Sequence, residues 1–226
     1  MSAGAVFFDL DGTLTDPKPG ITESIRYALT KIGRTPPSAD ELVWAIGPPL
    51  PGSLRRLLET DDETLVARAL ALYRERFGTV GLYENAIYPG IPETLTALRD
   101  RGLALYVMTS KPHVYAKPIV EHFGIGHLFT GVYGSELDLT RVDKGELIAH
   151  ALAEERLPPP RVVMVGDREH DMAGARECGV RAIGVTYGYG SEEELRAHGA
   201  ALIAHEPAAI PGLVSIILSP TQEDEP

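Results

Sequence analysis

The sequence predicts an α/β protein built on a doubly wound parallel sheet, with a small helical cap inserted after the first strand. Three observations support this prediction. Short apolar runs recur along the chain, helical patterns separate most of them, and the stretch from 17 to 84 contains helical patterns without a convincing strand. Strands that alternate with helices are typical of a parallel sheet with helices on both faces.

The predicted strands are four to eight residues long and apolar at both odd and even positions. A strand that is covered on both faces has this pattern, whereas a half-exposed strand alternates between apolar and polar residues. The runs are AVFFDL (5–10), LALYVMTS (103–110), HLFTGVYG (127–134), RVVMVGD (161–167), RAIGVTYG (181–188) and ALIAH (201–205).

Helix boundaries are marked by capping residues. The helical pattern from Ile91 to Arg101 stops before Gly102, a typical residue after a helix end, and Ser191 with Glu194 forms a capping box. In the insertion, Ser38 and Glu41 form a second capping box, and the Gly-Pro-Pro run at 47–49 should end that helix. Apolar residues at helical spacing mark two more helices: Ile21, Ile25, Ala28, Leu29 and Ile32, then Leu65, Ala69, Leu72 and Phe77. We therefore expect a core domain of residues 1–16 and 85–226 and a cap of residues 17–84.

Composition excludes several classes of protein. The chain has 226 residues and a net charge of −11, which disfavours binding to a nucleic acid polymer. A single cysteine, Cys178, cannot form a disulfide within the chain and fits a reducing compartment. No apolar run approaches a membrane span, and no leader precedes the first strand, so we expect a cytoplasmic protein. The acidic TQEDEP end is expected to be a solvated tail, and the oligomeric state is not readable.

Polar residues stand at the ends of several predicted strands. Ligands of open α/β sheets bind at the carboxyl ends of the strands, so these side chains should converge on one point. The set consists of Asp9 and Asp11 after the first strand, Thr109 and Ser110 after the second, Lys144 at the start of a helix, and Asp167 with Asp171 near the fourth.

Such a dense carboxylate cluster needs a compensating cation, because like charges repel strongly in a partly buried site. Oxygen ligands suit Mg²⁺. A lysine and backbone amides could then hold an anionic group opposite the metal, which is the arrangement that phosphoryl transfer requires.

At this point the motifs resemble a known family. DLDGT at 9–13, the strand-end Thr109, Lys144 and GDREHD at 166–171 resemble the four signature motifs of the haloacid dehalogenase-like hydrolases, in order and over nearly the whole chain. The helical insertion resembles that superfamily's C1-type cap.

The resemblance implies a role for each motif residue. Asp9 would be the nucleophile that takes the phosphoryl group, and Asp11 would protonate the leaving alkoxide and then deprotonate the attacking water. Thr109, the Ser110 amide and Lys144 would bind the phosphoryl oxygens, and Gly12 would let the backbone come close to the phosphoryl group. The implied Mg²⁺ ligands are Asp9, the Asp11 carbonyl, Asp167 and Asp171.

The resemblance also narrows the reaction. The superfamily's dehalogenases lack the second aspartate, so Asp11 favours a phosphatase or a phosphomutase acting on a small phosphorylated metabolite. The chain is similar to the phosphoglycolate phosphatase-like branch, whose close members include 5′-nucleotidases. Lys111, Arg55 and Arg56 are candidates for substrate recognition: phosphoglycolate would call for a cation in the cap, a nucleotide for an apolar slot. A phosphomutase and a non-catalytic phosphometabolite sensor are the remaining alternatives.

Overall fold

The computed structural model describes residues 4–219, so the TQEDEP end lies outside the described residues. Its main sheet has six strands in the order β5-β4-β1-β6-β7-β8, and every neighbouring pair is parallel. The strands are β1 (Ala5–Phe8), β4 (Ala104–Pro112), β5 (Gly131–Ser135), β6 (Val162–Gly166), β7 (Arg181–Val185) and β8 (Ala200–Ala204). The predicted parallel α/β sheet is thereby confirmed.

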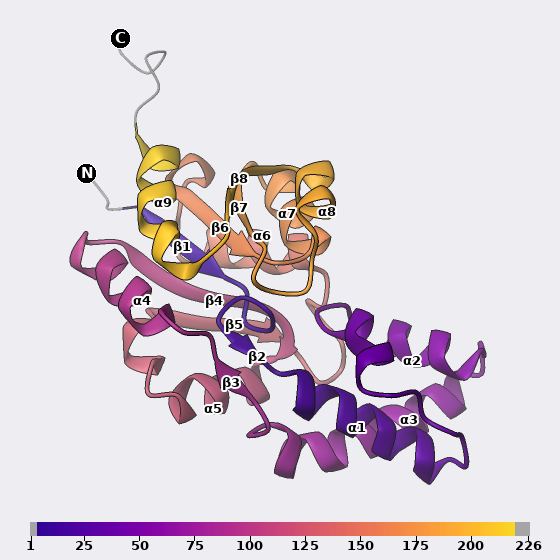
Figure 1. Ribbon diagram of the computed structural model, residues 1–226. Helices are drawn as coiled ribbons and strands as arrows, with labels where there is room; N and C mark the ends of the chain where they lie inside the picture. The colour runs from indigo at the N-terminus through magenta and orange to yellow at the C-terminus, as the bar shows by residue number, and fades with distance from the viewer. Residues whose placement is uncertain (1–3, 220–226) are drawn as a thin grey trace.

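Helices cover both faces of the sheet (Figure 1). Alternate β1 residues enter two separate apolar clusters: Val6 and Phe8 lie in one, Ala5 and Phe7 in the other. The first cluster includes residues of α4 (Ile91–Asp100), α5 (His113–His122) and α9 (Ile210–Leu218). The second includes residues of α6 (Lys144–Glu154), α7 (Glu169–Glu177) and α8 (Glu192–His198). Burial on both faces explains why the strand runs carry no polar alternation.

The position of β1 explains where a ligand can bind. The chain leaves β1 toward β4 and β5 on one side, and returns to build β6, β7 and β8 on the other. Strand order therefore reverses beside β1, and such a reversal opens a crevice at the carboxyl ends of the strands. Phe8 is in register with Val107 of β4 and Val165 of β6, so the residues that follow these three strands emerge at similar heights.

The segment after β1 forms a separate group of helices beside the sheet (Figure 1). It contains α1 (Lys18–Lys31), η1 (Asp40–Ala45), α2 (Leu50–Leu58), α3 (Glu63–Arg76) and η2 (Phe77–Gly81). We call residues 18–81 the helical insertion. A two-stranded antiparallel sheet of β2 (Thr15–Asp16) and β3 (Ala86–Ile87) joins its two ends to the rest of the chain. The boundaries of a cap at 17 and 84 stay a prediction.

The predicted capping signals correspond to observed helix ends. Arg101 caps α4, and Gly102 has a φ of +79°. The Ser191 side chain accepts the Glu194 amide at the start of α8. Ser38 and Glu41 form reciprocal hydrogen bonds, but the segment they open, η1, is a 3₁₀-helix rather than an α-helix.

The remaining short helices are η3 (Gly126–Leu128), η4 (Pro159–Arg161) and η5 (Pro207–Ala209). Among residues 4–219, none of the helices is both long and apolar enough to cross a membrane.

Candidate active site

The chain turns sharply after β1. The Leu10 carbonyl accepts hydrogen bonds from the amides of Leu14 and Thr15, both at 3.0 Å, and the Gly12 amide donates to the Thr15 carbonyl at 2.7 Å. Gly12 has a φ of +89°, and a Cβ placed there would lie 2.2 Å from an oxygen of Asp167. Glycine is therefore required at this position by backbone conformation and by space.

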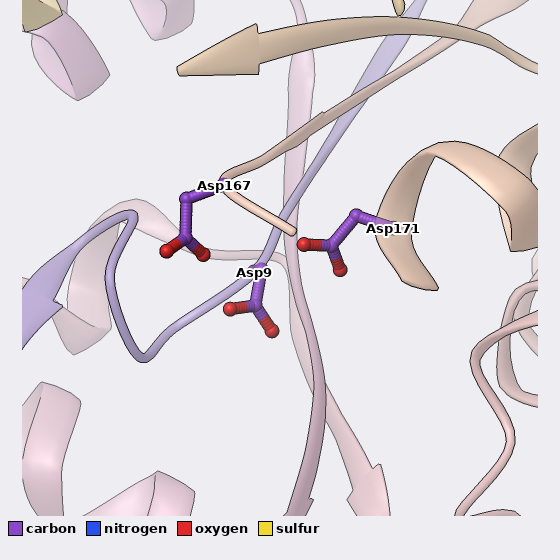
Figure 2. Close-up of side chains that lie close together, drawn as sticks. All are labelled: Asp9, Asp167 and Asp171. Carbon is purple, nitrogen blue, oxygen red and sulfur yellow. The ribbon is translucent and has the colours of Figure 1, made fainter. Parts of the chain in front are cut away.

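Three carboxylates meet at the carboxyl end of the sheet (Figure 2). Asp9 follows β1, Asp167 follows β6 and Asp171 lies in the first turn of α7. One oxygen from each lies within 4.8 Å of the others, and all three residues are buried. The structure thus brings together three of the four residues predicted to bind the metal.

Lys144 supplies a positive charge to this cluster. Its ammonium lies 2.7 Å from Asp9 Oδ1 and 2.7 Å from Asp171 Oδ1, and it donates to the Met108 carbonyl at 2.8 Å. It is the first residue of α6, where the Asp143 side chain accepts the Glu146 amide and caps the helix. This lysine therefore holds the start of α6 against β4.

One lysine does not balance three buried carboxylates. Burial, reinforced by Asp171 and opposed by Lys144, raises the pKa of Asp9 to about 7. Burial together with the Asp9 and Asp171 charges also raises the pKa of Asp167 well above its usual value. Burial disfavours the charged form of Lys144, but the Asp171 and Asp9 carboxylates outweigh it and raise the lysine pKa. Three clustered oxygen donors with excess negative charge fit a hard divalent cation such as Mg²⁺.

The end of β4 carries Thr109 and Ser110, whose side chain and amide, respectively, are predicted to bind phosphate. Pairing between β4 and β5 shifts register between Thr109 and Pro112, so Ser110 and Lys111 fall outside the regular ladder. The Thr109 hydroxyl accepts the Lys111 amide at 3.2 Å, and the Ser110 hydroxyl donates to the Val142 carbonyl at 3.1 Å. Such bulges commonly redirect side chains next to active sites.

Asp11 faces a different partner from Asp9. Its Oδ1 lies 2.9 Å from the Lys111 ammonium, and the two side chains are only 9% and 6% exposed. The Asp11 side chain is not part of the three-carboxylate cluster. The two aspartates of the first motif are thus held by two different lysines.

A pocket opens between the carboxyl end of the sheet and the helical insertion. Asp9, Asp11, Thr109, Ser110 and Lys111 line its inner end. The rest of its lining is mostly apolar or aromatic, with Arg74 as a further cation, and includes Leu50, Leu70, Tyr73, Phe77, Tyr115 and the Gly-Pro-Pro turn at 47–49. The empty space in the pocket, with its open mouth included, is about 740 Å³.

The two predicted cap arginines have partners elsewhere. Arg55 forms an ion pair with Glu63 at 2.6 Å, and the Arg56 guanidinium lies 4.1 Å from the centre of the Trp44 ring. Neither lines the pocket. The structure therefore does not support a direct role for them in substrate recognition, because their charges are used on the surface of the insertion.

Sequence reasoning missed a contact that spans the insertion and the core. Arg168 donates to the Ile46 carbonyl at 2.7 Å and to the Glu194 carboxylate at 3.0 Å. Nothing in the GDREHD motif marks a distant backbone acceptor for this arginine. The contact fixes the chain just before the Gly-Pro-Pro turn that lines the pocket.

Tyr187 and Tyr189 of the YGYG segment at 187–190 form hydrogen bonds with the site loops. The Tyr187 hydroxyl donates to the Thr13 carbonyl at 3.0 Å, and the Tyr189 hydroxyl donates to Asp16. The Tyr189 amide also donates to Asp167 Oδ2 at 2.8 Å. This segment thus holds both the turn after β1 and one carboxylate of the cluster.

Comparison with known proteins decides the family. The family profile described as haloacid dehalogenase-like hydrolase matches residues 6–185. The chain belongs to the haloacid dehalogenase-like hydrolases. The family expected from the motifs is confirmed.

Individual relatives of this hydrolase carry several names. It is 51% identical over 195 residues to a 5′-nucleotidase of Pseudomonas aeruginosa, covering 85% of this chain and 87% of that protein. It is 40% identical to the tyrosine-protein kinase PtkA of Mycobacterium tuberculosis, covering 88% and 68% of the two chains. It is 28% identical to a phosphoglycolate phosphatase of Pseudomonas putida, covering 92% and 78%.

A solved structure agrees with the fold. The crystal structure of a predicted phosphatase from Clostridium acetobutylicum superimposes with a TM-score of 0.90 at 38% identity, covering 95% of this hydrolase and 99% of that chain. Together, these comparisons support the predicted class of enzyme, a phosphoric monoester hydrolase.

Proposed function

We propose that this hydrolase is a Mg²⁺-dependent phosphatase that uses Asp9 as its nucleophile and acts on nucleoside monophosphates. The main observation in support of this reaction is that the Asp9 and Asp11 carboxylates lie in different surroundings. Asp9 lies in the carboxylate cluster beside Lys144, while Asp11 lies with Lys111 at the inner end of the pocket. A nucleophile and an acid–base group need these separate environments.

The metal site would consist of the Asp9, Asp167 and Asp171 carboxylates, with the Asp11 carbonyl as a further oxygen ligand. Bound Mg²⁺ would neutralise charge on the phosphoryl group and on the cluster. Lys144, the Thr109 hydroxyl and the Ser110 amide would bind the phosphoryl oxygens. Gly12 would contribute by allowing the turn to pass close to Asp167, because its own amide already donates to Thr15.

Two steps complete the reaction. An Asp9 oxygen attacks phosphorus, the bond from phosphorus to the leaving oxygen breaks, and Asp11 gives its proton to that oxygen. Water then attacks the phosphorus of the aspartyl phosphate and gives a proton to Asp11. The bond between Asp9 and phosphorus breaks, so that inorganic phosphate leaves and Asp9 is restored.

The walls of the pocket favour the nucleotide over phosphoglycolate, the substrate that the sequence alone favoured. Phosphoglycolate would bring a carboxylate as a second anionic group. The two cations in the pocket lining are already engaged, Lys111 with Asp11 and Arg74 with the Leu137 carbonyl, and Arg55 and Arg56 have partners elsewhere. A nucleoside offers a flat base that Tyr73, Phe77 and Tyr115 can contact. The 51% identity to a 5′-nucleotidase supports the same choice.

The first test is phosphate release from a panel of phosphomonoesters with Mg²⁺ and with EDTA. The panel contains nucleoside 5′-monophosphates, phosphoglycolate, sugar phosphates and p-nitrophenyl phosphate. We expect the highest kcat/KM for a nucleoside monophosphate and no release with EDTA. Asp9→Asn should lose turnover while it keeps the fold, and near-normal activity in that variant would remove Asp9 as the nucleophile.

The same panel separates the alternatives. A phosphomutase would convert a hexose 1-phosphate to its isomer when a trace of the bisphosphate is added. A sensor would bind phosphoesters with Mg²⁺ without releasing phosphate. A nucleotide-dependent kinase, the activity named for the mycobacterial relative, would transfer label from ATP to a tyrosine-containing acceptor rather than to water.

A further inference from the structure

The proposed reaction gives Lys111 no task, although its ammonium is buried in the wall of the pocket. Its side chain is 6% exposed, and burial of an ammonium without a strong partner is costly. The lysine does not belong to the Lys144 cluster, since its ionic partner is Asp11. A buried charge at this position calls for a function.

The position of Lys111 is fixed by an irregularity in β4 and by contacts of its side chain. The register shift after Thr109 takes it out of the β-ladder, and its amide donates to the Thr109 hydroxyl at 3.2 Å. Its ammonium then lies 4.6 Å from the centre of the Phe77 ring, which belongs to the helical insertion. The lysine is therefore held from three sides: by the end of β4, by Asp11 and by an aromatic face.

Lys111 and Asp11 form an ion pair in which the ammonium and one carboxylate oxygen can each still form hydrogen bonds. The two charged atoms are 2.9 Å apart. Yet within the described residues neither Lys111 Nζ nor Asp11 Oδ1 makes a hydrogen bond of good geometry. Both residues line the pocket, and each of the two buried atoms keeps hydrogen-bonding capacity that its partner does not use.

We infer that Lys111 is the positioning residue for Asp11: its ammonium holds the acid–base carboxylate at the inner end of the pocket, toward the leaving oxygen of the substrate. The inference rests on the proposed function, because it assigns a task within the same reaction. It differs from a role in binding the far end of the substrate, which would make the lysine a specificity residue.

The two roles have different kinetic consequences. Proton donation matters when the leaving oxygen is a poor leaving group, and it matters little when the departing anion is already stable. The loss caused by removing a residue that positions Asp11 should therefore grow with the pKa of the leaving group. The loss caused by removing a substrate-binding cation should follow the charge of the substrate.

The experiment compares p-nitrophenyl, phenyl and benzyl phosphate, whose leaving groups have similar size, no charge and rising pKa. The quantity measured is kcat/KM, which reports the first step and not the shared hydrolysis of the aspartyl phosphate. Lys111→Met keeps an apolar chain against Phe77. We expect this variant to lose about 100-fold on benzyl phosphate and less than about 3-fold on p-nitrophenyl phosphate.

Two further variants serve as controls. Lys111→Arg keeps the charge and should recover most of the activity on benzyl phosphate. Lys117→Met removes an exposed lysine from α5 and should leave all three rates unchanged. Circular dichroism and the melting temperature of each variant establish that the fold is kept.

An equal loss on all three esters would overturn the inference, because it would mean that Lys111 only supports the fold or binds phosphate. The same variant is also assayed on a nucleoside monophosphate and on phosphoglycolate, and a loss confined to these two substrates would also overturn the inference, in favour of substrate binding. Failure of the proposed function is distinguishable, since the wild-type enzyme would then release no phosphate from p-nitrophenyl phosphate with Mg²⁺, and the inference would fall with it.

Discussion

Gly12 combines a left-handed backbone with a close approach to a carboxylate of the site. Its φ of +89° is strained for other residues, and a Cβ would lie 2.2 Å from Asp167. We predict that Gly12→Ala loses more than about 100-fold in kcat/KM, because Asp167 must move out of the carboxylate cluster. Phosphate release and Mg²⁺ titration measure the effect.

Gly33 provides the matched control for Gly12. It has a similar φ of +82°, but nothing lies within 4 Å of a Cβ placed there. Gly33→Ala should therefore cost about 1 kcal/mol of stability through backbone strain alone and keep normal activity. Equal activity losses in the two variants would show that the contact with Asp167 is not the cause.

The carboxylate cluster makes stability depend on pH when no metal is bound. The folded pKa of Asp9, about 7, lies above its unfolded value of 3.8, so the unfolded chain loses its proton first as pH rises. The metal-free fold therefore loses stability between about pH 4 and pH 7 and is least stable above that range.

From this dependence we predict that Mg²⁺ stabilises the protein by about 1 kcal/mol more at pH 8 than at pH 6, since the metal offsets a charge that is present mainly at the higher pH. Melting temperatures with EDTA and with Mg²⁺ at both values measure the difference. Asp9→Asn should remove most of it. A difference that survives in this variant would assign the pH dependence to another group.

Whether a residue belongs to the site could be predicted from the sequence only where the residue lies in a motif. Asp9, Asp167, Asp171 and Lys144 were expected to converge, and the structure brings them together. The partners of Arg55 and Arg56 could not be predicted, because a charged residue on an amphipathic helix carries no signal that separates a cleft from a surface ion pair.

Among the helices and strands, those that could be predicted are the ones long enough to show a periodic or continuous apolar pattern. The six main strands were visible because each is a run of apolar residues. The two-residue strands β2 and β3 were missed, since a pattern cannot be read from two positions. The capping box of Ser38 and Glu41 predicted a start but not the 3₁₀ geometry of η1, which depends on packing against other elements.

One contact between elements bears on substrate choice. Arg168, at the start of α7, holds the carbonyl of Ile46 just before the Gly-Pro-Pro turn of the pocket wall, and Glu194 of α8 orients its guanidinium. The turn should therefore lose its position when the guanidinium is removed. Substrates that fill the pocket would be affected more than substrates that do not.

We accordingly predict that Arg168→Gln raises KM for a nucleoside monophosphate about 10-fold, the value of one charge-assisted hydrogen bond, and changes KM for acetyl phosphate little. Steady-state kinetics on both substrates measure the split. Arg196→Gln, which removes an exposed arginine paired with Glu192 on its own helix, is the control. Equal increases for both substrates would indicate that Arg168 acts on the metal site instead.

At the scale of the whole molecule, the helical insertion meets the core around the rim of one pocket. Besides Arg168 and Ile46, Arg74 of α3 donates to the Leu137 carbonyl at 2.7 Å, and Lys111 lies on the ring of Phe77. The covalent link between the two parts is narrow, formed by β2 and β3 (Figure 1). Buried apolar residues of the insertion, such as Ile25 and Leu54, belong to the same cluster as Phe8 of the sheet, so the two parts also share apolar packing. From the narrow link we nevertheless expect the insertion to move as a body, as caps over phosphatase sites need to do.

The last prediction follows from this architecture and is measured by amide hydrogen exchange. With Mg²⁺ and a phosphoryl mimic such as tetrafluoroaluminate plus a nucleoside, exchange should slow in segments 46–52 and 70–77, which line the pocket, while buried β6 and β7 stay unchanged. The variant with both Arg74→Gln and Arg168→Gln should exchange faster in the same two segments when no ligand is present. Slower exchange spread evenly over the sheet and the insertion would mean that ligand binding stabilises the whole fold. In that case the insertion would not move as a separate cap. The boundaries predicted at 17 and 84 would then not mark the ends of an independently moving unit.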